Sequence, residues 1–248
     1  MKIAIIGYGK MGRMIEKICL ERGHQITARV DIGSGDTFDS TGFTEADVAI
    51  EFTTPEAAVG NVSEAILRGI PVVCGTTGWN DAMPEVRDLL ERKNGTLLWA
   101  SNFSIGMNVF MAMNRYLSAI MSRIPGYRPE IEEIHHIHKL DHPSGTAVSL
   151  ANDLMDAFPG LSGMDVMEES GRGNDTAPGK LPVYYRREGE VAGIHEVTWT
   201  SAADRISMRH EAFSREGFAL GAVIAAEWIK GKHGFFGMRD ILGDIIKN

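Results

Sequence analysis

The sequence predicts an α/β fold, in which helices cover both faces of a parallel sheet. Two observations predict this fold: short apolar runs alternate with segments of helical periodicity, and glycines stand where one kind of segment passes into the other. Repeated strand–helix–strand units form parallel sheets, which bind ligands beyond the carboxyl ends of their strands. We therefore expect the functional residues of the N-terminal part in the loops that follow its strands.

The first unit, KIAIIGYGKMGRMIEKICLERGHQITARV, has the order strand, glycine turn, helix, strand. Gly7, Gly9 and Gly12 follow the pattern G-x-G-x-x-G between the first strand and the helix. Gly7 permits a tight turn, Gly9 lets the backbone approach a pyrophosphate, and Gly12 allows the helix to pack closely on the strand. A plain strand–helix turn is the alternative, but the context favours a Rossmann-like domain that binds a nicotinamide dinucleotide.

An acidic residue ends the second strand of this unit. Asp31 follows the glycines by about twenty residues, where a carboxylate can bind the ribose hydroxyls of the adenosine, and this favours NADH. Lys10 in the turn and Arg29 nearby could instead bind the additional phosphate of NADPH. The predicted cofactor is therefore NADH, NADPH or both, and the preference stays open.

The alternation continues beyond this unit. The expected elements are a strand in DVAIEFT, a helix in PEAAVGNVSEAILRG, a strand in IPVVCG, a helix in NDAMPEVRDLLERKNG and a strand in TLLWASN. Two of these strands end in small residues, with Thr53 at one end and Gly75, Thr76 and Thr77 at the next. Such residues let a flat nicotinamide ring and its ribose lie close to the backbone, although ordinary turn chemistry is the alternative.

Composition and charge disfavour several classes of protein. The chain has 248 residues, of which 44% are apolar, and this suffices for a folded core. Its net charge of −8, with both signs mixed along the chain, disfavours nucleic acid or an anionic membrane as a partner. No apolar run approaches the about 20 residues of a membrane span and no secretory leader is evident, so we expect a cytoplasmic protein.

Cys19 and Cys74 are the only cysteines, and their contexts do not resemble a disulfide framework. Cys74 ends an apolar strand, and the nearby sequence supplies no obvious base. We therefore interpret Cys74 as a buried, inert thiol rather than as a nucleophile of the kind that aldehyde dehydrogenases use.

The segment EIEEIHHIHKLDHPSGTAVSLA concentrates carboxylates, histidines and a lysine. If residues 131–137 form a strand, His135 and His136 project from opposite faces, and His138 shares the face of His136. His136 and His138 could then bind zinc. However, Lys139 follows at once and no cysteine accompanies them, so we predict no metal. A solvated polar strand is the other alternative.

The end of the same segment predicts an anion site. The turn P-S-G-T leads into a helix with an apolar face, which Ser144 or Thr146 can cap. Gly145 lets a ligand approach the N–H groups of the helix N-terminus, which attract an anion. Lys139 and the histidines add positive charge and a proton donor that works near neutral pH. These residues predict reduction of a small anionic substrate by a nicotinamide cofactor.

The pattern E-I-x-E-x-H-x-x-x-K-x-D-x-P-S-G-T-A, residues 130–147, resembles the signature of the 4-hydroxy-tetrahydrodipicolinate (dihydrodipicolinate) reductase family of lysine and diaminopimelate biosynthesis. Further segments are similar to the family: GYGKMGR, EFTTPEA, CGTTGW, ASNFSIGMN, HEVTWTSAADRISMRHEAFSREGFALGA and GFFGMRDIL. Together they span nearly the whole chain. The resemblance implies hydride transfer from NADH or NADPH to C4 of the dipicolinate ring, addition of a proton at C3 and net loss of water.

The resemblance also implies two domains. Residues 1–104 with 215–248 would bind the dinucleotide. Residues 105–214 would form a central α+β domain with a mixed sheet, which binds a small dicarboxylate substrate and builds a homotetramer. The segment FALGAVIAAEWIKGK reads as a helix that is apolar on more than one side. Residues 160–182, rich in glycine and acidic residues, are expected to form a mobile loop.

The same resemblance implies a role for individual residues. His135 would be the acid–base residue, and Lys139 would be a second proton donor. The substrate carboxylates would be bound by His136, Ser144, Gly145 and Thr146. The cofactor would be bound by Gly7, Tyr8, Gly9, Lys10, Met11 and Gly12 at the pyrophosphate, by Asp31 at the adenosine ribose, by Thr53, Gly75, Thr76 and Thr77 on the nicotinamide side, and by Ala100, Ser101, Asn102 and Phe103 at the nicotinamide itself.

Two other functions stay open. One is another oxidoreductase of this fold that acts on a different small acid, such as a semialdehyde dehydrogenase that uses Cys74. The other is a non-catalytic nicotinamide sensor or partner-binding protein, in which His135, Lys139 and the Ser-Gly-Thr turn would have no joint purpose.

Overall fold

The computed structural model describes residues 1–172 and 176–247, and the chain forms two compact units. The first unit comprises Met1–Asn108 and Glu216–Asn248, and the second comprises Val109–Arg215. The boundaries that the family resemblance implies follow residues 104 and 214. Among the described residues, no helix is long and apolar enough to cross a membrane.

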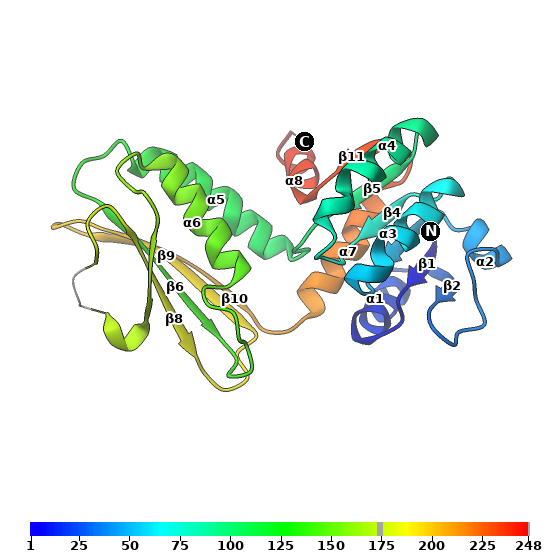
Figure 1. Cartoon of the computed structure of the whole chain (residues 1–248), viewed down its shortest axis with the longest axis horizontal. Helices are drawn as coiled ribbons and strands as arrows, with labels where there is room; N and C mark the ends of the chain where they lie inside the picture. Colours follow the sequence, from blue (N-terminus) through cyan, green and yellow to red (C-terminus); the bar gives the residue numbers. More distant parts are fainter. Residues whose placement is uncertain (173–175, 248) are drawn as a thin grey trace. The chain divides into compact units, whose positions relative to one another are not determined.

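The first unit contains a six-stranded sheet whose strands are all parallel, as the sequence predicts (Figure 1). In spatial order the strands are β11 (Gly234–Phe236), β5 (Thr96–Trp99), β4 (Val72–Cys74), β3 (Val48–Glu51), β1 (Lys2–Ile6) and β2 (Gln25–Val30). Its helices are α1 (Lys10–Glu21), α2 (Thr41–Thr44), α3 (Pro55–Leu67), α4 (Met83–Lys93) after a 3-10 turn at Asn80–Ala82, α7 (Glu216–Ile229) and α8 (Met238–Lys247). Strands β3 and β4 are buried along their whole length, because helices cover both faces of the sheet.

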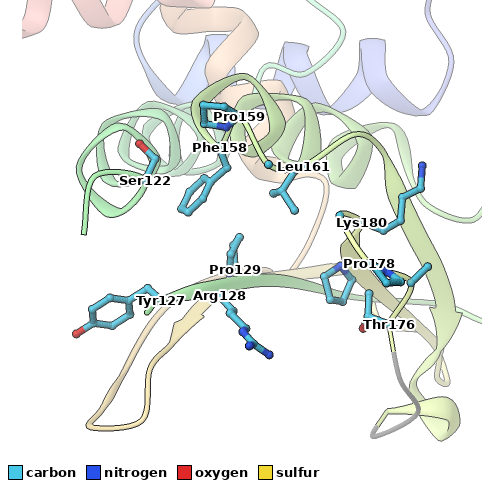
Figure 2. Close-up of a pocket in the computed structure, with 14 residues that line it drawn as sticks. Ser122, Tyr127, Arg128, Pro129, Phe158, Pro159, Leu161, Thr176, Pro178 and Lys180 are labelled. Atoms are coloured by element: carbon cyan, nitrogen blue, oxygen red, sulfur yellow. The ribbon is translucent and has the colours of Figure 1, made fainter. Parts of the chain in front are cut away.

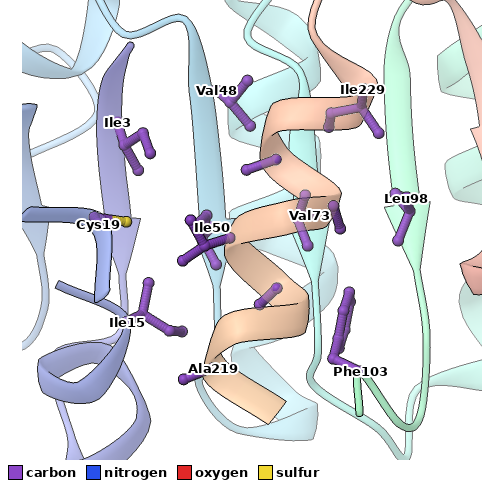
Figure 3. Packing of buried hydrophobic residues seen from close by; sticks show 14 of the residues in the cluster. Ile3, Ile15, Cys19, Val48, Ile50, Val73, Leu98, Phe103, Ala219 and Ile229 are labelled. Atoms are coloured by element: carbon purple, nitrogen blue, oxygen red, sulfur yellow. The ribbon is translucent and has the colours of Figure 1, made fainter. Parts of the chain in front are cut away.

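Two hydrophobic clusters lie on the two faces of this sheet. One joins the strands to α1 and α7, with Ile15, Cys19 and Val223 among its buried residues (Figure 3). The other joins the strands to α3 and α4 through Val62 and Leu90. Successive residues of β1 alternate between the two clusters, as the pleat of a strand requires.

Helix α7 brings the C-terminal segment into the first unit. It packs against α1 and against β3, β4 and β5, so it is apolar on more than one side, as predicted. Figure 3 shows Ala219 and Ile229 of α7 in one cluster with the strand residue Val73. A Cβ added at Gly221 would lie 1.7 Å from the carbonyl oxygen of Phe103, so glycine lets the helix reach the loop after β5.

The strand order of this sheet reverses at β1. From β1 the chain runs outward to β2 and then returns to β3, which pairs with the other side of β1. Parallel sheets bind ligands at such a reversal, outside the carboxyl ends of the strands. The loops after β1, β3 and β4 therefore meet where a cofactor is expected.

The second unit contains a five-stranded mixed sheet with the order β10-β9-β6-β8-β7. The central strand β6 (Arg128–His135) is parallel to β8 (Leu181–Arg187) and antiparallel to β9 (Gly193–Thr200). The edge strands are β7 (Met164–Glu168), parallel to β8, and β10 (Arg205–Ala212), antiparallel to β9. Helix α6 (Gly145–Ala157) packs on β6 and β8 and is bonded to α5 (Ile105–Met121) through Asn114, whose Nδ2 donates to the carbonyl of Leu150 at 3.2 Å.

Two predicted elements of this unit are wrong in part. The expected strand 131–137 ends at His135, where the partner strand β8 also ends, and the following histidines lie in a loop. The expected loop 160–182 contains β7 and a 3-10 turn at Glu169–Gly171. Strand β7 forms because it pairs with the next strand, β8, which begins at Leu181 within the expected loop, and polar composition does not reveal such a partner. Residues 173–175 of the expected loop lie outside the described residues.

Candidate active site

A hollow of about 390 Å³ lies at the carboxyl ends of β1, β3 and β4 in the first unit. It is lined by Gly9, Lys10, Met11, Phe52, Thr53, Pro55, Gly75, Thr76 and Thr77. The sequence predicts all of these residues at the cofactor except Phe52 and Pro55, which belong to the same loop as Thr53. The fold thus brings three predicted strand-end loops into one site.

The glycine turn has the shape that a pyrophosphate needs. Gly7 has a positive φ of 90°, and a Cβ there would lie 2.1 Å from the carbonyl oxygen of Phe52. No described atom lies within 4 Å of a Cβ built at Gly9, which leaves this backbone open to a ligand. Within the described chain, no side chain caps α1, and its first turn holds no acidic residue. The first N–H groups of α1 are therefore available to an anion, and a dinucleotide fits here.

Asp31 lies beside this glycine turn. Its Oδ2 accepts the backbone N–H of Tyr8 at 2.9 Å, and its Oδ1 accepts that of Ile32 at 2.7 Å. Arg29, a candidate for binding the phosphate of NADPH, is instead engaged by Glu16. Its Nε donates to Glu16 Oε2 at 3.2 Å, its Nη2 donates to Oε1, and the Tyr8 hydroxyl donates to the same carboxylate. The hydrogen bond from Arg29 lowers the pKa of Glu16, so this carboxylate stays charged and neutralises the guanidinium.

The loop after β5 is not part of the lining of this hollow. Phe103 is 2% exposed, and its ring belongs to the hydrophobic cluster that α7 covers. Asn102 uses its Oδ1 to accept the N–H of Ser104 at 2.9 Å. The expected contact of Ala100, Ser101, Asn102 and Phe103 with the nicotinamide stays a prediction. For Phe103 it concerns the backbone, because the ring is committed to the core.

In the second unit, β6 ends at His135. His135 is 8% exposed, and its Nδ1 lies 3.4 Å from Oε2 of the fully buried Glu133, on the face that the strand alternation predicts. Burial lowers the pKa of His135 to about 4, although Glu133 opposes this shift. The positive charges of Lys139 and Arg187 lower it further. His135 is therefore uncharged near neutral pH until a negative charge is brought close to it.

Helix α6 begins directly after Ser144. The Ser144 hydroxyl accepts the N–H of Ala147 at 3.2 Å and lies 3.1 Å from His195 Nε2, so Ser144, rather than Thr146, caps the helix. Gly145 is exposed, and no described atom lies within 4 Å of a Cβ built on it. The open N-terminus of α6 is thus formed by Gly145 and Thr146, whereas Ser144 is buried and already bonded. Contact of Ser144 with the substrate stays a prediction.

Arg187 of β8 organises the loop between β6 and α6. Its Nε donates to the carbonyl of Lys139 at 3.2 Å, and its Nη2 donates to the carbonyl of Asp141 at 2.7 Å. The ammonium of Lys139 pairs with both oxygens of Asp141 at 2.8 Å. Of the other histidines here, His136 is half-buried, and the exposed His138 lies 3.3 Å from a carboxylate oxygen of Glu190.

The arrangement of the histidines also bears on a metal. Among the described residues, the group with closely spaced ligand atoms is Glu133, His135 and His195, whose atoms lie within 4.8 Å of one another, rather than His136 and His138. Both oxygens of Glu133 accept the N–H of Ser144, and Arg187 Nη2 lies 3.2 Å from one of them. A guanidinium at this distance is unfavourable beside a dication.

A separate hollow of about 780 Å³ lies in the second unit (Figure 2). Tyr127 and Pro129 line it at the start of β6, and Phe158 and Leu161 line it just after α6. In the described part of the chain, none of the predicted catalytic or ligand-binding residues lines this hollow. The candidate residues of the second unit therefore lie at the end of β6 and the N-terminus of α6, away from this hollow.

Two family models match this chain over nearly its whole length. The family model described as dihydrodipicolinate reductase, N-terminus, matches residues 1–103, and the model described as dihydrodipicolinate reductase, C-terminus, matches residues 106–242. The chain belongs to the dihydrodipicolinate reductase family. It is 42% identical to the 4-hydroxy-tetrahydrodipicolinate reductase of Christiangramia forsetii over 248 residues, which cover 100% of both chains. It is 34% identical to the corresponding reductase of Archaeoglobus fulgidus over 98% of this chain and 100% of that one.

A solved structure of the dihydrodipicolinate reductase family has the same fold. The dipicolinate-bound dihydrodipicolinate reductase of Paenisporosarcina sp. TG-14 matches with a TM-score of 0.74 over 95% of this chain and 96% of that chain. The two sequences are 21% identical. The likeness confirms the fold class, a parallel Rossmann-like sheet with a second mixed sheet, for this family member.

Cys74 of this dihydrodipicolinate reductase family member has a neighbour that the sequence does not reveal. Its Sγ donates at 2.9 Å to Oε2 of Glu51, which stands 23 residues earlier in the sequence. Burial and the negative charge of Glu51 raise the pKa of Cys74 far above its ordinary value. The thiolate is therefore disfavoured, as the interpretation of Cys74 as a buried, inert thiol requires, and Glu51 adds to the effect of burial.

Four residues of this reductase family member lie beside the candidate site residues although the sequence predicted no role for them. Glu133, Arg187 and His195 surround the catalytic candidates in the second unit. Glu51 accepts a hydrogen bond at 3.1 Å from the hydroxyl of Thr76, which lines the first hollow. Glu133 stands in the recognised pattern without an assigned role. Arg187 and His195 lie on β8 and β9, so only the pairing of these strands with β6 brings them to the site.

Proposed function

We propose that this chain reduces 4-hydroxy-tetrahydrodipicolinate to tetrahydrodipicolinate with NADH or NADPH, in lysine and diaminopimelate biosynthesis. The observation that carries the proposal is the folding of the family signature. His135 at the end of β6 and the open N-terminus of α6 are tied together through Glu133, in a chain 42% identical over its whole length to a curated reductase. This combination supplies an acid beside an anion site, as reduction of a dicarboxylate requires.

The two units would divide the work. We assign dinucleotide binding to residues 1–104 with 215–248, on the basis of the glycine turn and the strand-end hollow. We assign substrate binding and homotetramer formation to residues 105–214. The homotetramer rests on the family resemblance. Two free, buried cysteines and a net charge of −8 support a cytoplasmic enzyme without a nucleic-acid partner.

The substrate carboxylates would be bound at the start of α6. Gly145 and Thr146 offer N–H groups and a hydroxyl, and His136 adds an imidazole from the loop. The bound dipicolinate of the Paenisporosarcina reductase supports a ligand with two carboxylates. Lys139 lies in the same loop, and its ammonium stabilises negative charge that develops in the ring.

Proton transfer would fall to His135 and Lys139. When bound, the cofactor supplies a hydride to C4 of the conjugated ring, while a proton is added at C3 and water is lost overall. The pKa of His135, about 4 in the free protein because of burial, rises when the two substrate carboxylates bring negative charge nearby. We infer that the substrate itself charges the imidazole, which then holds the proton close to the reacting carbon.

A coupled assay tests this function. The product of dihydrodipicolinate synthase is supplied, and the oxidation of NADH and of NADPH is followed by absorbance. We expect His135→Ala and Lys139→Ala each to lower kcat about 10²-fold to 10⁴-fold. The exposed His138→Ala serves as the matched control and should retain the activity. If neither cofactor is oxidised by the wild type, the proposed function is wrong, and if both variants stay active, the proton donors are wrong.

A further inference from the structure

Glu133 is a fully buried carboxylate with no role in the proposed chemistry. It lies on β6, two residues before His135, and its side chain has no exposed area. A buried carboxylate without partners lowers the stability of the fold, so the partners of Glu133 indicate its role. These contacts lead to the N-terminus of α6, to the loop that carries Lys139, and to His135.

The first contact is with the N-terminus of α6. Glu133 Oε1 and Oε2 accept the backbone N–H of Ser144 at 3.1 and 3.0 Å. Ser144 in turn caps α6 and lies 3.1 Å from His195 Nε2. The carboxylate thereby fixes the residue that directly precedes the anion-binding groups of Gly145 and Thr146.

The second contact is with Arg187, whose Nη2 lies 3.2 Å from Glu133 Oε1. The same guanidinium holds the carbonyls of Lys139 and Asp141, as described above. Arg187 supplies the positive charge that a buried carboxylate needs. It also connects Glu133 to the loop that carries the second proton donor, Lys139.

The third contact is with His135. Its Nδ1 lies 3.4 Å from Glu133 Oε2, and the rings of His135 and His195 meet edge to face with centroids 5.1 Å apart. Among the described residues, Nδ1 of His135 has no well-aligned hydrogen-bond partner, but Glu133 Oε2 is near enough to accept its proton after a small rotation of either side chain. His135 Nε2 lies on the side of Gly193, where a Cβ would approach it to 3.1 Å.

We infer that Glu133 is a positioning residue. Its carboxylate holds the His135 imidazole with Nδ1 protonated, and it fixes the position of this ring relative to the N-terminus of α6. A single carboxylate thus aligns the acid with the anion site, and Arg187 balances its charge. This inference rests on the proposed function for its kinetic consequences, whereas the tautomer of His135 can be observed without any reaction.

The wild-type protein provides the first test. Ring-nitrogen chemical shifts of isotope-labelled His135, assigned by their absence from His135→Gln, should show the neutral ring protonated at Nδ1. A predominant Nε2–H tautomer would overturn the inference. This measurement requires no substrate, so it stands even if the proposed reaction fails.

Glu133→Gln provides the second test, since its side-chain oxygen can still accept the N–H of Ser144 while its charge is lost. We expect kcat to fall at least about 10²-fold, with KM for the substrate changed less than about threefold. Glu132→Gln is the matched control, because Glu132 is the neighbouring residue of β6, faces the other way and binds Arg172. It should leave both constants unchanged.

The pH profile separates positioning from a merely structural role. Glu133 raises the pKa of His135 against burial and against the charges of Lys139, Arg187 and His136. Loss of Glu133 must therefore lower this pKa, so the limb where activity falls with rising pH moves to lower pH in Glu133→Gln. An unchanged limb, or equal losses of kcat in Glu133→Gln and Glu132→Gln, would count against the inference.

Discussion

At the scale of single residues, burial decides whether Cys74 can react. The thiol has no exposed area, and Glu51 lies 2.9 Å from its sulfur, so burial and a like charge both disfavour the thiolate. We expect iodoacetamide to alkylate Cys74 at least ~100-fold more slowly in the native protein than in urea, measured by peptide mass spectrometry. Cys74→Ala should retain kcat/KM within about threefold. Rapid native alkylation together with loss of activity would instead favour the semialdehyde dehydrogenase.

Glu16 sets the charge available beside Asp31, where we propose that the adenosine ribose binds. It neutralises Arg29, so Glu16→Gln should release a guanidinium for the additional phosphate of NADPH. We expect the affinity for NADPH relative to NADH to rise about tenfold, measured as dissociation constants by calorimetry without substrate. Glu21→Gln removes the same charge from the exposed end of α1 and should leave the ratio unchanged. If Glu16→Gln also leaves the affinity for NADPH relative to NADH unchanged, Arg29 does not reach the cofactor.

At the scale of elements, close packing of α7 depends on Gly221. A Cβ there would lie 1.7 Å from the carbonyl oxygen of Phe103, so helix or loop must move. Gly221→Ala should lower the free energy of unfolding by about 1–3 kcal/mol, measured by urea denaturation. Gly60→Ala in the exposed part of α3 is the control, where no described atom lies within 4 Å of the new Cβ. That variant should gain about 0.5–1 kcal/mol, and equal losses in both would refute the packing argument.

Helices and strands that periodicity and capping residues define match the sequence prediction. Elements whose limits depend on pairing with another strand do not. The parallel strands, the glycine turn and the helix after Ser144 follow from periodicity and capping residues. Strand β7 and the end of β6 at His135 both depend on pairing with β8, and the pairing of β6 with β8 joins distant parts of the chain. The candidate residues of each unit show the same division. Gly9 and Thr76 in the first unit carry local signals, but Arg187 and His195 in the second unit reach His135 through strand pairing.

At the scale of the whole molecule, buried histidines make stability depend on pH. Burial lowers the pKa of His135 to about 4 and that of His195 to about 3, below the value of about 6.5 in an unfolded chain. As pH falls below about 6.5, the unfolded state binds protons that the native state does not, so stability is lost on acidification.

The free energy of unfolding should therefore decrease between about pH 7 and 5, with a slope approaching roughly 1.4 kcal/mol per pH unit for each such histidine. Urea denaturation at several pH values measures this slope. His195→Gln should reduce it, whereas the exposed His138→Gln should not. A wild-type stability that stays constant over this range would show that these histidines are accessible to protons in the native state.

The amino-acid sequence alone predicted the alternating fold of the first unit, the glycine turn that we propose for the dinucleotide and the segment that we propose for the acid and the anion site. These features rest on residues close together in the chain, whose spacing and backbone preferences act locally. The tertiary structure alone decided that Glu51 faces Cys74, and that Glu133 binds Ser144 and Arg187 beside His135. These features depend on strand order and burial, because the partners of a buried carboxylate come from whichever elements the fold packs around it.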